Sequence, residues 1–395
     1  MPRYPFTPEV LDAMPEECAE LFRGLEITII NKIADRLKND ASKINETTLQ
    51  EIRVLRSHGM QLDEIQKAIS KTSGISERVL DDLLVDVVSR NQEYYTELIT
   101  LADLVRPDVL VDAVFIEAIK RETLGTFRNI TRSMGFLVDS GRAMLPPAQA
   151  YQWALNSATM QVQSGATSYG QAIANATRQL ADSGLKVVDY QSGRHDQIDV
   201  AVRRAVLTGV SQISDKFTEQ NAEYLGTRYY EISAHAGARD VPGPNGWESH
   251  KDWQGKVYYE SESGEPDPLG KYPDLAESTG YGYVDGLMGA NCRHRRYPWI
   301  EGVSKRTYTD DELKNIDPPA FEYEGRKYTH YAATQKQRQI ENAVRHWKRR
   351  VAAATDDEDK AVAQARVARL QEKYVEFSRI AGLRTQPERM SIYRS

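Results

Sequence analysis

Three histidines and a cysteine, the side chains best suited to metal chemistry, stand within residues 235–294: His235, His250, Cys292 and His294. Thiolate sulfur and imidazole nitrogen are the donors that zinc prefers, so these four are candidate metal ligands. Their spacing is not that of a zinc finger, and Cys292 and His294 need a turn between them to reach one ion. The alternative is a hydrogen-bonded cluster that holds long loops together. We expect that structural cluster, with no metal bound.

The same stretch could also carry covalent or acid–base chemistry. Cys292 could act as a nucleophile with His250 or His294 as its base, but the sequence identifies neither an orienting third group nor an oxyanion hole. A ribonuclease-like site would combine His250 with Arg239 or Arg293 for acid–base work and phosphate binding. Such pairs of His and Arg are common in structural loops, so we expect no catalytic residue and no enzyme.

Basic side chains gather at two places where nucleic acid could bind. The run Arg293, Arg295 and Arg296 could meet phosphates. A second group lies in a predicted C-terminal helical hairpin and consists of Lys336, Arg338, Arg345, Lys348, Arg349 and Arg350. For this second group we favour a solvated face, part of whose charge is neutralised by the acids at 356–359.

Composition limits the class of protein. The 395 residues are 40% hydrophobic and 27% charged, as in soluble globular proteins, and their number predicts two or three domains. No apolar run reaches the roughly 18 residues of a membrane span, and the N-terminus lacks the pattern of a signal peptide. We therefore expect synthesis in a cytosol. The net charge of -6 argues against wholesale wrapping of nucleic acid.

The elements that position these residues are mainly helices. Residues 1 to about 200 show apolar residues at helical spacing, with a stripe over 21–37 and a second over 80–98 that follows a predicted cap at Ser76. Short breaks predict hairpins, and they stand at His58-Gly59, Ser73-Gly74 and Arg106-Pro107. A helix is expected to start at Pro146-Pro147 and another to end near Gly184. An extended piece over 185–190 and a turn over 191–193 precede a long helix over 198–224.

The texture of the sequence changes after Gly226. Residues 227–233 are rich in β-forming side chains, and 236–289 carry many glycines, prolines and tyrosines, which predicts a small α+β module with short strands. Helical spacing returns after Pro318-Pro319 as two stripes with a turn over 355–359, which predicts an αα-hairpin. The expected fold class is α+β, predominantly α. The expected domains are a helical region 1–140, a helical region 141–226, the module 227–305, and a linker with hairpin 306–395.

Several strings of residues, in a consistent order over about 140–395, resemble the phage minor capsid protein 2 family. They are Asp189-Tyr-Gln-Ser-Gly-Arg194, Asp199-Val-Ala-Val-Arg-Arg-Ala-Val-Leu-Thr-Gly209, Ser233-Ala-His-Ala-Gly-Ala-Arg239, His250-x-x-Trp-Gln-Gly-Lys-Val257, Asn291-Cys-Arg-His294, Tyr297-Pro-Trp-Ile-Glu-Gly-Val-Ser304, Tyr331-x-x-Thr-Gln-Lys-Gln-Arg-Gln-Ile-Glu341, Tyr374-x-x-Phe377 and Gly382-Leu-Arg384. Several strings in order are far more specific than any one of them.

The 227–305 module is similar, more loosely, to the F-like head-morphogenesis domain of Mu-type phages. The resemblance groups Arg239, His250, Asn291, Cys292, Arg293 and His294 as a polar cluster. Residues 240–247 lengthen the gap between Arg239 and His250. His294 stands where many relatives have a second cysteine, which argues against a paired-thiolate metal site.

The resemblance implies a structural protein of a tailed-phage head, made in the host cytoplasm. It implies contact with the portal or inner capsid, a role in assembly or DNA delivery, an oligomeric setting in the particle, and no membrane. Two alternatives stay open. One is a packaged effector enzyme, a nuclease or transferase, with its site around His250 and Cys292–His294. The other is a DNA-binding accessory protein that uses the basic hairpin.

Overall fold

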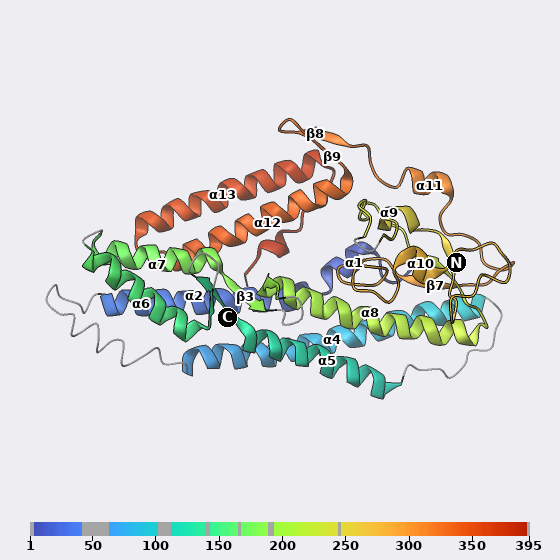
Figure 1. The fold of residues 1–395 in the computed structure, drawn as a ribbon, viewed down its shortest axis with the longest axis horizontal. Helices are drawn as coiled ribbons and strands as arrows, with labels where there is room; N and C mark the ends of the chain where they lie inside the picture. The colour runs from blue at the N-terminus through green and yellow to red at the C-terminus, as the bar shows by residue number, and fades with distance from the viewer. Residues whose placement is uncertain are drawn as a thin grey trace. The chain divides into compact units, whose positions relative to one another are not determined.

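The computed structural model describes residues 4–41, 63–101, 112–138, 143–164, 167–188, 193–243 and 246–392. Within them the chain forms two compact units, each built from three separate stretches. The first unit comprises Met1–Pro15, Val79–Gly125 and Arg204–Lys336, and the second comprises Glu16–Arg78, Thr126–Arg203 and Gln337–Ser395. Helices with small antiparallel sheets confirm the predicted α+β, predominantly α class (Figure 1). The four contiguous domains stay a prediction, with 227–305 wholly inside the first unit.

Long helices make up much of both units, and four of them contribute residues to both. These four are α4 (Asp63–Leu101), α5 (Ala113–Ser133), α8 (Ile198–Tyr224) and α12 (His330–Ala353). The bounds of α8 are those expected from the sequence, and its apolar stripe from Val202 to Phe217 is buried. None of the helices that the structure describes is long and apolar enough to span a membrane.

The predicted break at Ser73-Gly74 and the predicted cap at Ser76 are wrong, because α4 runs through both without interruption. The Ser76 hydroxyl donates to the Ser73 carbonyl one turn back at 2.9 Å, inside the helix. A buried serine can satisfy its hydroxyl in this way, so its presence does not require a helix start. The breaks predicted at 58–59 and 106–107, and residues 191–192 of the predicted turn, lie outside the described residues.

The second unit holds a four-stranded antiparallel sheet of order β2-β1-β3-β4. Its strands are β1 (Met134–Val138), β2 (Ala143–Leu145), β3 (Leu185–Val188) and β4 (His195–Gln197). Only β3 was expected, since the rest of this region was assigned to helices. β1 pairs with β3, and Met134 lies opposite Val187, some fifty positions away in the sequence. The spacing of apolar residues within a short segment cannot predict a contact over such a separation.

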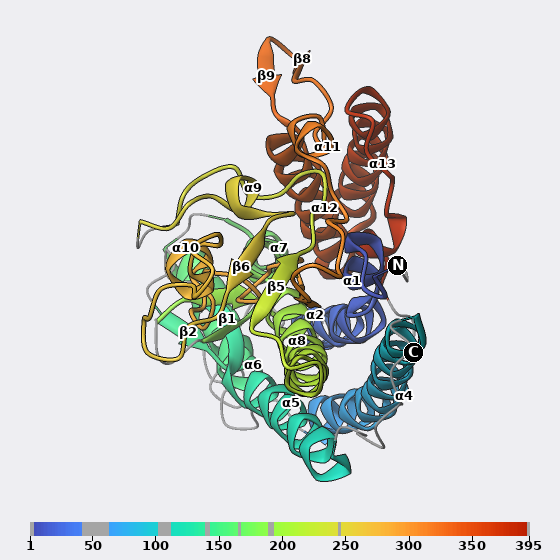
Figure 2. The same cartoon turned by 90° about the vertical axis from the view of Figure 1, so that its right-hand side faces the viewer.

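Further helices complete the second unit. They are α2 (Glu16–Ala41), α6 (Pro147–Gln163), α7 (Tyr169–Ser183) and α13 (Asp357–Ile380), with a short 3-10 turn η1 (Pro387–Met390). The expected helix start at Pro147 and the helix end at Gly184, whose φ is +62°, are both confirmed. α13 lies along α12 as the predicted hairpin (Figures 1 and 2), and Gln337 donates to Ser378 across it at 2.9 Å.

The first unit contains the predicted loop-rich module, and its three-stranded sheet has the order β6-β5-β7. The strands are β5 (Tyr229–Ile232), β6 (Val257–Tyr259) and β7 (Arg296–Trp299), all antiparallel, with Tyr230 opposite both Tyr258 and Pro298. Figure 2 shows β5 and β6 side by side. Short elements complete the unit: α1 (Pro8–Ala13), α9 (His250–Trp253), α10 (Leu275–Thr279), α11 (Asp310–Lys314), β8 (Phe321–Tyr323) and β9 (Arg326–Tyr328).

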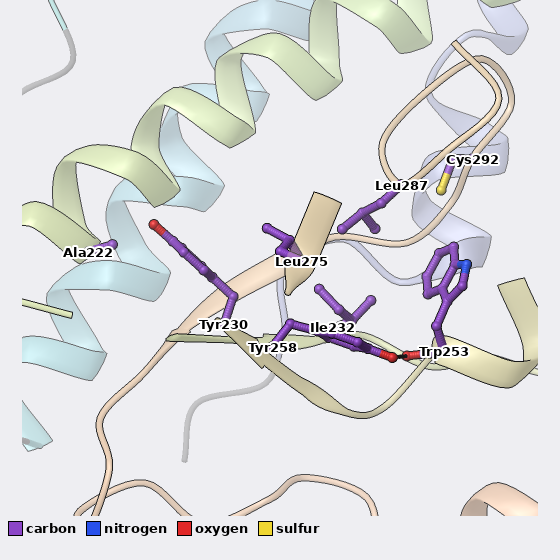
Figure 3. Packing of buried hydrophobic residues seen from close by; sticks show 8 residues of the cluster. All are labelled: Ala222, Tyr230, Ile232, Trp253, Tyr258, Leu275, Leu287 and Cys292. Carbon is purple, nitrogen blue, oxygen red and sulfur yellow. Dashed lines mark hydrogen bonds between the residues drawn. The ribbon is translucent and has the colours of Figure 1, made fainter. Parts of the chain in front are cut away.

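A buried cluster joins the sheet to the short helices of the module (Figure 3). It consists of Ala222, Tyr230, Ile232, Trp253, Tyr258, Leu275, Leu287 and Cys292. Tyr258 satisfies its hydroxyl by donating to the Trp253 carbonyl at 3.0 Å. Figure 3 shows Cys292 at the end of the cluster that carries Trp253 and Leu287. Cys292, the one cysteine described in this unit, therefore lies at the edge of the buried core of the module.

Candidate functional site

The site begins at His250, the first residue of the four-residue helix α9. A capping box forms this helix: the Ser249 hydroxyl accepts from the Asp252 backbone N–H, and the Asp252 carboxylate accepts from the Ser249 backbone N–H at 3.2 Å. Ser249 and His250 are both buried. The capping box stabilises the start of this short helix and thereby places His250 there.

Cys292 and His294 stand at the end of a tightly coiled loop. Met288 and Asn291 have φ of 59° and 61°, a left-handed conformation that is uncommon for a residue such as methionine. A Cβ on Gly286 would lie 1.9 Å from the Gly280 carbonyl oxygen, so only glycine fits there. Strained backbone of this kind persists where surrounding contacts require it, and it often marks functional positions.

The structure brings His250, Cys292 and His294 together, and we call these three the histidine–cysteine cluster. The Cys292 Sγ lies 3.8 Å from His250 Nδ1 and 3.6 Å from His294 Nδ1. One ligand atom from each of the three residues lies within 4.8 Å of the others. All three side chains are buried, with His294 only 1% exposed. The two-residue spacing of Cys292 and His294 does converge, because the coiled loop supplies the turn.

Each histidine of the cluster uses its outer nitrogen for a hydrogen bond. His294 Nε2 lies 3.0 Å from Gln254 Oε1, and His250 Nε2 lies 3.3 Å from the backbone carbonyl of Asp285. Gln254 Oε1 also accepts from the His235 backbone N–H at 3.0 Å, so this atom is the amide oxygen. Both histidines therefore carry their proton on Nε2, and both Nδ1 lone pairs face the sulfur.

His235 lies beside the cluster but does not belong to it. Its ring stacks on His294 with centroids 4.4 Å apart, and its Nδ1 contacts the Ala236 carbonyl at 2.9 Å. The Trp253 ring covers another side, 4.6 Å from His250 and 4.7 Å from His294. Of the four metal-ligand candidates, three converge and the fourth forms part of the wall.

Burial makes the cluster electrically neutral. It raises the pKa of the Cys292 thiol, against backbone hydrogen bonds from His294 and Met288 that lower it. Burial, with Arg239 nearby, lowers the pKa of His250 to about 4, and burial brings the pKa of His294 well below its usual value. A cysteine nucleophile needs a thiolate, usually beside a protonated histidine. The described geometry instead favours a thiol between two neutral imidazoles.

The other members of the predicted polar cluster spread around this centre. Arg239 donates to the Asp285 carbonyl at 3.4 Å, the same oxygen that His250 contacts. Arg293 points away, toward Asp12 of α1 at 3.3 Å, and Asn291 is exposed. Arg239 therefore supports the cluster indirectly, whereas Arg293 and Asn291 do not touch it through any contact described here.

The basic run after Cys292 lies mainly inside the module. Arg296, 1% exposed, contacts Asp215 at 2.7 Å and Glu260 at 3.0 Å, with its guanidinium between the rings of Tyr230 and Tyr281. Arg295 is buried as well and donates to the His294 carbonyl at 2.8 Å. Both guanidinium groups are out of reach of a phosphate backbone in this fold.

The basic residues of α12 pair with carboxylates and carbonyls of the second unit. Arg349 is buried, donates to the Ala181 carbonyl at 2.9 Å and contacts Glu26 at 3.5 Å. Arg345 contacts Asp199 at 3.3 Å, Lys348 donates to the Met390 carbonyl, and Arg350 pairs with Asp182. Lys336 and Arg338 are half-buried. The acids described as meeting this group are thus Glu26, Asp182 and Asp199. Of the acids at 356–359, Asp356 caps α13 and Asp359 pairs with Arg178.

Comparison with known proteins gives the family. A model of the family described as phage minor capsid protein 2 matches residues 6–377. The chain belongs to that family. A structural protein of Lactococcus phage LL-H is 22% identical to this minor capsid protein over 344 residues, 85% of the chain and 87% of that protein. A structural protein of Lactococcus phage mv4 is 37% identical over 84 residues, 21% of the chain and 58% of that protein. No solved structure matches.

The family match confirms the resemblance drawn from separate strings, and it extends into the N-terminal 140 residues, where only helical pattern had been seen. Sequence reasoning about this minor capsid protein missed Gln254, Asp285 and Tyr4. Tyr4 stacks on Tyr297 with centroids 3.7 Å apart and so ties the N-terminal segment to the module. The sequence did contain a sign of Gln254, which stands inside the string from His250 to Val257. It was not singled out because an amide side chain is neither a usual metal ligand nor a catalytic group.

Proposed function

We propose that this minor capsid protein is a non-enzymatic component of the phage head, which docks on the portal or the inner capsid and assists assembly or DNA delivery. The match to the family over residues 6–377 carries the proposal, and the LL-H structural protein, similar over nearly its whole length, supports it. The likeness of the module to the Mu F-like domain stays a prediction.

The geometry of the module favours a structural role over the packaged-enzyme alternative. An active site needs reactive groups in a concave pocket that substrate can enter. Here the thiol and the two imidazoles of the histidine–cysteine cluster are buried and neutral, and they hold the α9 and 286–294 segments against each other. Such a cluster suits a rigid module that keeps its shape inside a particle.

The charges support protein docking over DNA binding as the main activity. The net charge is -6, and the basic residues of both groups that have described partners meet carboxylates or carbonyls of their own unit. A phosphate contact at these positions would have to displace those partners. The DNA contact predicted from Arg293, Lys336 and Arg338 stays a prediction of second rank.

The test is co-sedimentation of the purified chain with portal rings of its own phage, beside a salt titration against duplex DNA. We expect the chain to pellet with the rings and to bind DNA weakly. A DNA-binding protein would instead lose affinity with salt at a log–log slope of about -0.9 per phosphate neutralised. Tight, salt-sensitive DNA binding without association with the rings would overturn the proposal.

A further inference from the structure

We propose that His250, Cys292 and His294 bind one zinc ion, with the Cys292 thiolate and the Nδ1 atoms of the two histidines as its protein ligands. This differs from the hydrogen-bonded cluster expected from the sequence, and it does not depend on where the chain docks in the particle. The proposal rests on the count of hydrogens and lone pairs at the centre of the cluster, on its distances, and on the groups that surround it.

At the centre of the cluster there is one hydrogen-bond donor fewer than there are acceptors. Both imidazoles place their proton on Nε2, because the Asp285 carbonyl and the Gln254 amide oxygen can only accept. Two Nδ1 lone pairs therefore face the Cys292 sulfur, whose thiol has a single hydrogen to donate. One buried acceptor stays unpaired without a further group, which is unfavourable in the interior of a protein. A cation at the centre is bound by both nitrogens and the sulfur at once.

The two sulfur–nitrogen distances are those of a zinc site. Zinc–sulfur and zinc–nitrogen bonds of about 2.3 and 2.0–2.1 Å in a tetrahedron place sulfur and nitrogen about 3.6 Å apart. The two sulfur–nitrogen distances of the cluster are 3.6 and 3.8 Å. All three ligand atoms already lie within 4.8 Å of one another. In that tetrahedron the two nitrogens lie about 3.3 Å apart, so the imidazole rings turn toward each other when an ion binds.

The surroundings match what metal ligands need. Ligating histidines usually donate their other N–H to a carbonyl or carboxylate, which fixes the ring, and His250 and His294 do so. The backbone of His294 and that of Met288 favour the thiolate, since they lower the pKa of Cys292 against the effect of burial. The Trp253 ring forms an apolar wall beside both histidines.

The charge balance requires the thiolate. Binding of Zn²⁺ forms the sulfur–zinc bond and releases the thiol proton to solvent, so the charge of the site rises by one unit only. Arg239 and Arg293 stand close enough to act on the histidines, and they disfavour a larger increase. Two histidines and one cysteine leave a fourth position for a water molecule, as in zinc sites with three protein ligands.

The test uses the tag-free, full-length chain, stripped with chelator and kept reduced, and Co²⁺ as a spectroscopic probe that Zn²⁺ displaces. We expect a thiolate-to-cobalt charge-transfer band that saturates at one equivalent and disappears when zinc is added. Cys292→Ser should lose the band. Cys18→Ala, which changes the other cysteine, in the second unit, should keep it and serves as the matched control.

A second measurement needs no variant. Alkylation of Cys292 in the folded wild-type chain, followed by mass spectrometry of its peptide, should slow at least tenfold when Zn²⁺ is added, while the Cys18 peptide is unaffected. Absence of both the cobalt band and the protection, in a chain whose circular dichroism shows it folded, would overturn the zinc site. A band that survives Cys292→Ser but not Cys18→Ala would overturn it equally.

Discussion

Gln254 Oε1 lies 3.0 Å from His294 Nε2 and thereby fixes the proton of His294 on the side away from Cys292. The same oxygen accepts from the His235 backbone N–H, so one buried amide orients two histidines of different segments. The order of the histidine–cysteine cluster thus depends on a residue that has no chemistry of its own.

Gln254→Leu should therefore destabilise the module and weaken its metal affinity. The buried His294 Nε2–H loses its acceptor, which costs about 1–3 kcal/mol, and the half-buried His235 N–H loses the same acceptor. Loss of such an outer hydrogen bond typically weakens metal binding about 10–100-fold. Urea denaturation and zinc competition measure the two effects. Gln171→Leu, at an exposed glutamine of α7, is the control and should change neither. Equal stabilities of the two variants would contradict the role given to Gln254.

The stability of the metal-free chain should fall between pH 6.5 and about 4 because of His250. Burial and Arg239 lower the pKa of His250 from 6.5 to about 4, with Asp285 acting in the opposite direction. In this window the unfolded chain binds a proton that the folded chain does not, so unfolding is favoured as pH falls. The contribution is complete above pH 6.5 and disappears as the pH approaches 4.

The comparison of wild type with His250→Gln isolates this contribution from those of other titrating groups. With chelator present, the free energy of unfolding of the wild type should fall more steeply with decreasing pH, by up to about 1.4 kcal/mol per pH unit. Urea midpoints at several pH values measure it. Identical slopes would show that His250 does not titrate as its environment implies.

Arg296→Met should be among the most destabilising single changes in the first unit. It would leave Asp215 and Glu260 without their shared cation and the rings of Tyr230 and Tyr281 without theirs. Removal of one partner from a buried ion pair costs about 3–5 kcal/mol. Arg296→Lys keeps the charge but not the planar fork, so an intermediate loss is expected. Thermal unfolding that leaves Arg296→Met level with an exposed control, Lys314→Met, would rule this out.

Two neighbouring arginines of α12 offer a direct comparison of buried and exposed pairing. Arg349 is buried against Glu26 and the Ala181 carbonyl, whereas Arg350 meets Asp182 nearer the surface. Arg349→Met should cost roughly 3 kcal/mol, and Arg350→Met about 0–1 kcal/mol. Denaturation in urea at low and high salt measures both. If Arg350→Met were the costlier change, the basic face of α12 would have a role other than internal pairing.

The sequence by itself determined the long helices, the change of texture after Gly226 and the family. Apolar side chains at helical spacing must share one buried face, so the stripe from Val202 to Phe217 predicted α8 correctly. Glycine at the end of a helix likewise marks a conformation that other residues avoid, as at Gly184. These features depend on residues a few positions apart, and a linear sequence contains them in full.

Only the tertiary structure decided what depends on distant neighbours. Strand β1 forms because it pairs with β3, where Met134 lies opposite Val187. No residue close to Met134 in the sequence indicates that pairing. The run Arg293 to Arg296 has the composition of a nucleic-acid contact, yet Arg296 is surrounded by Asp215 and Glu260 from two other segments. The histidines and Cys292 could be named from the sequence, but the direction of their lone pairs is set by Gln254 and the Asp285 carbonyl. Burial and hydrogen-bond partners are set by the fold. The protonation and pairing of these side chains depend on both, so they can be determined only from the tertiary structure.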